Sequence, residues 1–94
     1  MPGIIDLEEQ TLPSDCYVFK HSTRCPVSTV AANAVRNHEF DMDLYWINVV
    51  EQRELSNWVS SEYSVKHESP QLLRILNGGV EKVWNHGEIR EDTL

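Results

Sequence analysis

The sequence has little of what defines several common classes of protein. It contains only two cysteines and four glycines among its 94 residues. No apolar run approaches the ~20 residues that a membrane-spanning helix needs, so we expect no membrane partner. Two cysteines are too few for a disulfide scaffold or a structural zinc site, so we expect no metal. The length suits one compact domain over residues 1–94.

Basic residues are scarce as well. Eight Lys and Arg against fifteen Asp and Glu give a formal net charge of −7. An acidic surface repels phosphate backbones, so we expect no nucleic-acid partner. Residues 1–10 contain acidic side chains and no basic one, which is unlike a signal peptide and predicts a cytoplasmic location. The sequence gives no indication of the oligomeric state.

Hydrophobic periodicity predicts alternating strands and helices. Short runs of apolar, aromatic or β-branched residues predict strands at residues 16–21, 44–50, 72–76 and 80–84. Helical spacing predicts helices at residues 26–39 and 53–63. Asn77-Gly78-Gly79 predicts the turn of a closing hairpin. Residues 4–14 indicate only a short helix or turn, and residues 88–94 the start of a last helix.

This order of elements favours an α/β fold. Strand–helix–strand units imply parallel pairing, and the hairpin adds antiparallel strands to the same sheet. We therefore expect a mixed central sheet of about four strands with helices on both faces, for which a thioredoxin-like fold is the commonest small example. Apolar residues at helical intervals predict the buried face of the first helix, namely Val27, Val30, Ala31, Ala34 and Val35.

Cys25 lies where the first strand gives way to the first helix. Pro26 fits the first helical position, which makes Cys25 the N-cap. The sulfur would then lie near the free N–H groups of Val27 and Ser28, and these donors and the positive helix end favour a thiolate over a thiol. The four residues alone also allow a buried, inert cysteine that happens to precede a helix.

A local basic spot precedes Cys25 in this acidic chain. Arg24 is expected to add positive potential at the thiolate, and Lys20 and His21 are further candidates for the same effect. For His21 an ordinary surface position is equally compatible with the sequence.

The position that holds a second cysteine in C-x-x-C pairs is Ser28. Serine cannot resolve a mixed disulfide, although its hydroxyl can donate a hydrogen bond to a thiolate. Chemistry at Cys25 must then stop at a mixed disulfide that an outside thiol resolves. Cys16 lies at the far end of a strand, roughly 20 Å away at ~3.3 Å per residue, so we expect it to have no catalytic role.

Pro70 follows the second predicted helix and precedes a strand. The proline is compatible with a simple helix break before an edge strand. In a thioredoxin fold this place holds a cis-proline that faces the cysteine. The backbone of the preceding residue, Ser69, then stays free to pair with a bound thiol compound.

Three segments together resemble the YtxJ (BrxC) family of monothiol bacilliredoxins: residues 19–28 (FKHSTRCPVS), Val49–Arg53 with Ser56-Asn57, and residues 67–71 (HESPQ). The resemblance covers roughly residues 18–86. It implies a thioredoxin-like fold, Cys25 as nucleophile and Pro70 as the cis-proline. It further implies removal of bacillithiol from S-bacillithiolated cytosolic proteins, with bacillithiol as co-substrate and no tightly bound cofactor.

Two other functions compete with this one. A monothiol glutaredoxin-like carrier would bind an iron–sulfur cluster through Cys25, but that class has C-G-F-S where this sequence has C-P-V-S. A redox-sensing or interaction domain would have Cys25 modified without turnover.

Overall fold

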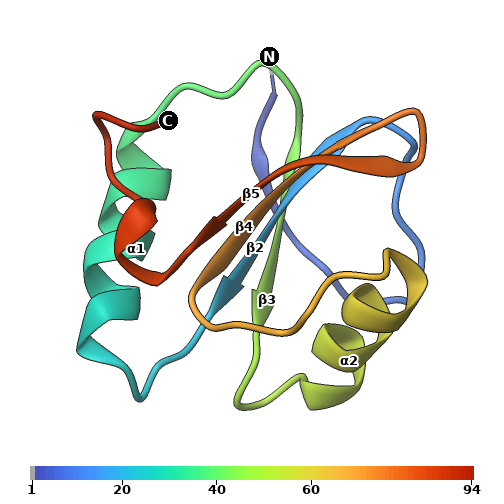
Figure 1. Cartoon of the computed structure of the whole chain (residues 1–94), viewed down its shortest axis with the longest axis horizontal. Helices are drawn as coiled ribbons and strands as arrows, with labels where there is room; N and C mark the ends of the chain where they lie inside the picture. The colour runs from blue at the N-terminus through green and yellow to red at the C-terminus, as the bar shows by residue number, and fades with distance from the viewer. Residues whose placement is uncertain (1) are drawn as a thin grey trace.

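The computed structural model describes residues 2–94 and shows a sheet between two helices (Figure 1). The strands are β1 (Ile4–Asp6), β2 (Cys16–His21), β3 (Leu44–Asn48), β4 (Gln71–Leu76) and β5 (Gly79–Asn85). The helices are α1 (Pro26–Asn37), α2 (Arg53–Glu62) and the short 3-10 helix η1 (His86–Glu88). Within residues 2–94 no helix is both long enough and apolar enough to cross a membrane.

The sheet is mixed and runs in the order β1-β3-β2-β4-β5. β3 pairs in parallel with β1 and with β2, and α1 forms the crossover that carries the chain from β2 to β3. β4 pairs antiparallel with β2 and with β5. The α/β class and the mixed sheet with helices on both faces are confirmed, and β2 occupies the centre of the sheet.

The prediction of about four strands is corrected to five. Residues 4–6 were expected to form a helix or turn, and instead they form edge strand β1 beside β3. β1 has three exposed residues and therefore no alternation of buried and exposed positions that a sequence reading detects. Its strand conformation comes from pairing with a distant segment.

The end of the chain also differs from the expectation. A helix was expected to begin near residue 88, whereas the only helical turn found there within residues 2–94 is η1. Asn85 caps that turn with its side chain, and Glu88 reaches back to the Asn85 N–H. Ile89 then packs, fully buried, into the core on the α1 side.

Each helix covers its own face of the sheet. On one face, α1 and Ile89 pack against Phe19, Trp46 and Trp84. On the other face, α2 packs through Leu55 and Val59. Figure 1 shows α1 and α2 on opposite sides of the strands.

The buried face of α1 is rotated from the predicted one. Val27 and Val30 are 45% and 63% exposed, so that part of the prediction is wrong. The buried residues of α1 are Ser28, Ala31, Ala32, Ala34 and Val35. Of these, Ser28, Ala31, Ala32 and Val35 follow helical spacing along one face. Small side chains at these positions let the helix lie close to the sheet, and a polar Ser28 concealed this face from a reading based on apolar residues.

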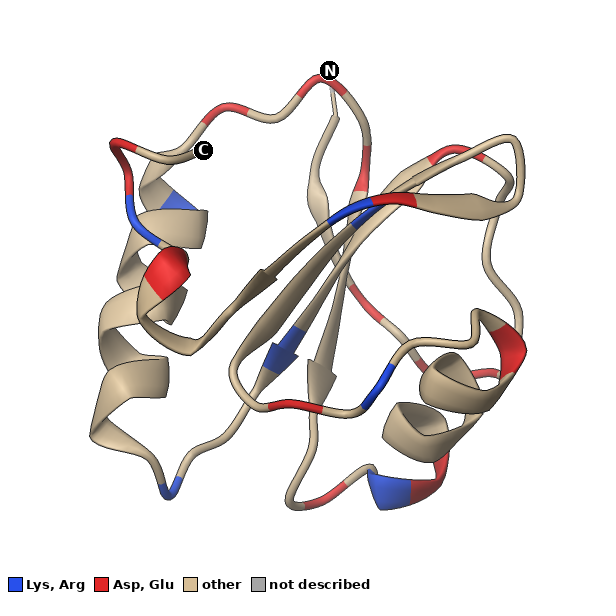
Figure 2. Ribbon diagram, in the orientation of Figure 1, with Lys and Arg blue, Asp and Glu red and all other residues tan. Residues whose placement is uncertain are grey.

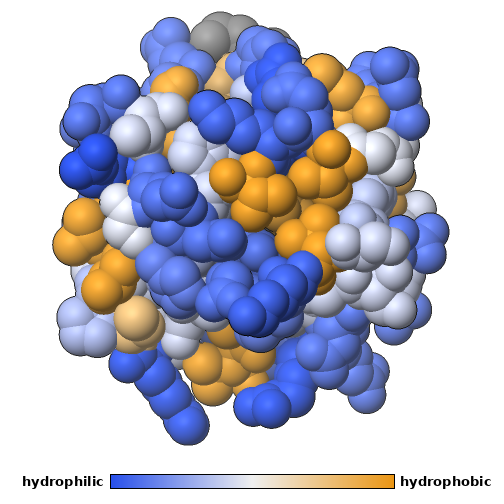
Figure 3. All heavy atoms as spheres, viewed as in Figure 1, coloured by the Kyte–Doolittle hydropathy of each residue, from blue (hydrophilic) through white to orange (hydrophobic). Residues whose placement is uncertain are grey.

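The hairpin between β4 and β5 follows the prediction. Asn77 and Gly78 have φ angles of 53° and 77°. Two consecutive positive φ angles define the turn whose twist matches that of a β-hairpin, and Asn-Gly is the favoured pair for it. Edge strand β5 keeps Val80 and Val83 half-buried. Figure 3 shows one side of the molecule, where apolar residues gather near the middle and hydrophilic residues cover most of the rim.

Candidate active site

Cys25 is the N-cap residue of α1, and Pro26 takes the first helical position. The central strand β2 ends at His21, so a short loop carries the chain from the middle of the sheet to the thiol. The loop closes through a hydrogen bond from the Cys25 N–H to the Ser22 carbonyl at 3.3 Å. Cys25 is half-buried, so its sulfur is reachable while its backbone is held.

The Cys25 thiol makes no capping hydrogen bond in the described structure. The Ser28 N–H, expected near the sulfur, donates instead to the Cys25 carbonyl at 3.0 Å. The first turn is thus closed by backbone groups. The Cys25 side chain thus lies at the positive end of the α1 dipole, with Arg24 next to it in the sequence.

The Ser28 hydroxyl forms its hydrogen bonds with residues that precede Cys25. It accepts a hydrogen bond from the Ser22 N–H at 2.9 Å and lies 2.8 Å from Nδ1 of His21. Burial, followed by the charge of Arg36, lowers the pKa of His21. The expected hydrogen bond from Ser28 to the sulfur is therefore replaced by one to His21.

The loop that carries Pro70 lies beside the same end of β2. β2 and β4 pair with Lys20 opposite Gln71, which places Pro70 next to the exit of β2. The Ser69–Pro70 peptide bond is cis, and the Pro70 carbonyl accepts a hydrogen bond from the His86 N–H at 2.9 Å. Among residues 2–94, the N–H and C=O of Ser69 have no backbone partner. These groups remain available to a bound molecule.

A groove of about 300 Å³ separates the Cys25 loop from α2. The side chains that line it include Arg24 from the loop, Arg53 and Asn57 from α2, and His67 and Ser69 from the Pro70 loop. The structure thus brings Arg24 and Ser69, both predicted site residues, to one groove. Pro26 and Val27 lie exposed beyond it on α1.

Comparison with known proteins decides the family. A family model described as "Monothiol bacilliredoxin BrxC" matches residues 4–94. The chain belongs to the monothiol bacilliredoxin BrxC family. This membership confirms the resemblance carried by the Cys25 and Pro70 segments.

Solved structures confirm the thioredoxin-like fold. A structure described as an oxidoreductase with a thioredoxin fold matches with a TM-score of 0.83 and 31% identity, over 96% of this chain and 88% of that chain. The reduced form of desulfothioredoxin from Desulfovibrio vulgaris Hildenborough matches with a TM-score of 0.52 and 19% identity, over 87% of this chain and 84% of that one. A redox enzyme of the bacilliredoxin family is therefore the general class.

A buried lysine lies behind the groove, and sequence reasoning assigned it only a general positive potential. Lys20 is fully buried, and its Nζ donates to Ser60 Oγ at 2.7 Å and lies 3.1 Å from Nδ1 of His67. Burial lowers the pKa of Lys20 to about 8. Within the described chain Lys20 has no carboxylate partner. The signal that would have found it is its place in a strand whose first five residues are all buried, because helices cover both faces of the sheet.

Cys16 lies far from this site, and its thiol has a different environment. It is fully buried at the start of β2, and its thiol donates to the Pro13 carbonyl at 3.7 Å. Burial first, then the charges of Asp15 and Asp43, raises the pKa of Cys16 to about 11. Both cysteines are free. The five steps of β2 alone span roughly 17 Å, so the two thiols do not meet.

Proposed function

We propose that the protein is a monothiol thiol–disulfide oxidoreductase that removes bacillithiol from S-bacillithiolated cytosolic proteins through a mixed disulfide at Cys25. Membership of the monothiol bacilliredoxin family supports the chemistry. The observation that carries the assignment to a residue is the contrast between the two cysteines. Cys25 is a reachable thiol at the N-terminus of α1, and Cys16 is fully buried.

The first step is attack of the Cys25 thiolate on the bacillithiol sulfur of a protein mixed disulfide. The S–S bond of the substrate breaks and a new S–S bond forms between Cys25 and bacillithiol. The substrate cysteine leaves as a thiolate and takes a proton from water. The α1 dipole and Arg24 favour the attacking thiolate.

Cys25 then carries bacillithiol while the Ser69 backbone groups, which lack backbone partners, hold the adduct against the Pro70 loop. Ser28 cannot resolve this disulfide, and the hydroxyl is fixed to His21 and Ser22. A second low-molecular-weight thiol must attack the bacillithiol sulfur. Its two electrons end on Cys25, which returns to the thiolate, and the products leave as a small disulfide.

The proposal is tested by intact-mass analysis after mixing the protein with a bacillithiolated model protein. The wild type should gain one bacillithiol and the substrate should lose one. Cys25→Ser should gain none, and Cys16→Ser should behave as the wild type. An adduct that persists in Cys25→Ser, or no adduct in the wild type, would overturn the assignment.

Turnover separates an enzyme from a redox sensor. With substrate in excess and a small thiol as reductant, an enzyme frees many equivalents of substrate per Cys25. A sensor reacts once and stops, which would leave the redox-sensing domain as the better description. An iron–sulfur carrier would instead show cluster absorbance after reconstitution.

A further inference from the structure

We propose that Arg24 and Arg53 form a subsite for the carboxylates of the small thiol that is exchanged at Cys25. The inference rests on the proposed function and names the chemical class of its co-substrate: a low-molecular-weight thiol that carries carboxylate groups. Both arginines line the groove of about 300 Å³, Arg24 from the Cys25 loop and Arg53 from the first turn of α2.

Both arginines lack a carboxylate partner among residues 2–94, although the chain has fifteen acidic side chains. Elsewhere acidic residues do pair with arginines. Arg74 contacts Asp41 and Glu81, and Arg90 contacts Asp92. No carboxylate within residues 2–94 therefore neutralises the charge of Arg24 or Arg53, although the molecule has a net charge of −7. Both residues line the same groove.

Acidic residues do occur nearby. Glu51 and Glu54 flank Arg53 in sequence, yet neither forms an ion pair with it in the described structure. Glu68 lies 2.7 Å from His86 and 3.6 Å from Lys66, so it already has two basic partners other than Arg24 and Arg53. Figure 2 shows a basic position before α1 and another at the start of α2 along the lower edge of the ribbon, with an acidic position between them and a third basic position near the end of β2, within the sheet.

The rest of the groove suits a polar ligand of this kind. Asn57 offers an amide to hydroxyl or carboxylate oxygens. Ser69 contributes a backbone N–H and C=O without backbone partners, and its buried hydroxyl lacks a hydrogen-bond partner within residues 2–94. The fully buried Lys20 lies behind His67, so the floor of the groove also carries positive potential.

The two ends of the ligand then contact different residues of the groove. Its sulfur meets Cys25, whose neighbour Arg24 already lines the groove. A carboxylate then reaches a guanidinium, which binds it with paired, charge-assisted hydrogen bonds. Selectivity among small thiols follows from the charge of their non-reacting part.

The test compares two mixed disulfides of one model protein. One carries bacillithiol, which has carboxylates, and the other carries 2-mercaptoethanol, which is uncharged. Arg53→Gln should raise KM for the bacillithiol adduct roughly tenfold with kcat little changed, and it should leave turnover of the 2-mercaptoethanol adduct unchanged. Arg24→Gln should raise KM for the bacillithiol adduct to a similar extent and should also slow both adducts, because Arg24 favours the attacking thiolate as well. Arg90→Gln, which removes one positive charge away from the groove, is the matched control.

A second measurement does not depend on the proposed function. Iodoacetate and iodoacetamide alkylate the same thiol and differ in charge. In the wild type, positive potential at the groove should favour the anionic reagent, and the rate ratio should fall roughly threefold in the double variant Arg24→Gln/Arg53→Gln.

The outcomes are distinguishable. An unchanged alkylation ratio together with an unchanged KM for the bacillithiol adduct overturns the subsite. Equal losses on both adducts in Arg53→Gln also overturn it, because Arg53 would then support the fold or the thiolate. If the wild type transfers neither thiol, the proposed function fails, and a charge-dependent alkylation ratio would still support the anion subsite.

Discussion

The two ends of strand β2 place two cysteines in different environments. At its start, Cys16 is fully buried between the charges of Asp15 and Asp43, and these features raise its pKa to about 11. Just past its end, Cys25 lies half-buried at a helix N-terminus, next to Arg24 in the sequence. The residue type is the same, so the two thiols differ only in the environment that each end of the strand provides.

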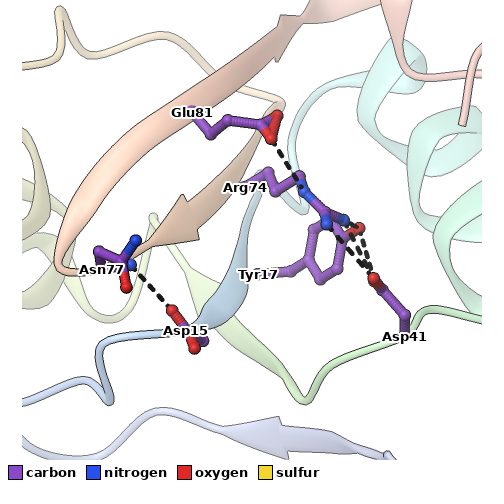
Figure 4. A network of polar contacts seen from close by, with 6 residues as sticks. All are labelled: Asp15, Tyr17, Asp41, Arg74, Asn77 and Glu81. Atoms are coloured by element: carbon purple, nitrogen blue, oxygen red, sulfur yellow. Dashed lines mark hydrogen bonds and ion pairs between the residues drawn. The ribbon is translucent and has the colours of Figure 1, made fainter.

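The acidic end is organised around one cation. Arg74 contacts Asp41, Glu81 and the Tyr17 hydroxyl, and the Asp15 carboxylate accepts the Asn77 N–H at 2.8 Å (Figure 4). These contacts are matched and lie mostly at the surface. The other end differs, because Arg24, Arg53 and Lys20 have no carboxylate partner within the described residues, although Glu68 there pairs with Lys66 and His86. We infer that the paired charges at the Cys16 end stabilise the fold, whereas the cations without a carboxylate partner at the groove are available to a ligand.

The largest expected effect is on reactivity. Cys25→Ser should abolish both bacillithiol transfer and alkylation of the native protein, since serine forms no disulfide. Cys16→Ser should leave both unchanged, because the Cys16 thiol is buried and protonated. Intact-mass analysis after a brief pulse of iodoacetamide counts the labelled thiols. Labelling of Cys16 in the native protein would contradict the comparison.

The next effect is on alkaline stability at the Cys16 end. The folded thiol keeps its proton up to about pH 11, whereas its reference pKa is 9.0. The unfolded state therefore binds fewer protons between these values, and stability falls as pH rises. The wild type should lose about 2 kcal/mol of unfolding free energy from pH 9 to pH 11 relative to Cys16→Ala.

Urea denaturation at a series of pH values measures this loss, and each protein serves as its own reference at pH 8. The comparison removes the cavity cost of the alanine, which does not depend on pH. Parallel curves for the two proteins would mean that Cys16 titrates as an exposed thiol does.

Lys20 at the other end should give the opposite slope. Its pKa falls to about 8 from 10.5, so the unfolded state binds more protons above pH 8 and stability rises with pH. The wild type should gain about 1 kcal/mol between pH 8 and pH 9. Lys20→Met, which keeps the length of the side chain, should show no such gain in the same denaturation series. A gain retained in the variant would assign the effect to another group.

The sequence predicted the parts of this comparison that depend on local pattern. Cys25 before Pro26 marked the N-cap, and the Asn77-Gly78 pair marked the hairpin. The features it missed depend on distant segments. β1 is a strand only because β3 lies beside it, and Lys20 is buried only because α2 covers that face of the sheet.

The α1 face shows the same limit inside one helix. Val27 and Val30 fit the helical period as well as the buried residues do. Only the packed sheet decides that Ser28 points inward, where its hydroxyl meets His21. Periodicity gives the spacing of a face, and tertiary contact selects which face is buried.

The smallest expected effect tests whether the acidic end is structural surface alone. Hydrogen bonds from Arg74 and Tyr17 lower the pKa of Asp41, yet its side chain is 63% exposed. Asp41→Asn should therefore cost less than about 1 kcal/mol near neutral pH, because solvent screens an exposed pair. The small contribution disappears as pH falls through the lowered pKa. Glu81→Gln, which removes the other carboxylate on Arg74, is the matched variant.

Bacillithiol transfer in both variants should equal that of the wild type, since the full length of β2 separates Arg74 from the groove. Denaturation gives the stability and intact mass gives the transfer rate. A loss of transfer at unchanged stability would mean that the charges at the Cys16 end reach Cys25 through the strand. The two ends would then act as one electrostatic unit, and the unmatched cations at the groove would depend on the matched ones.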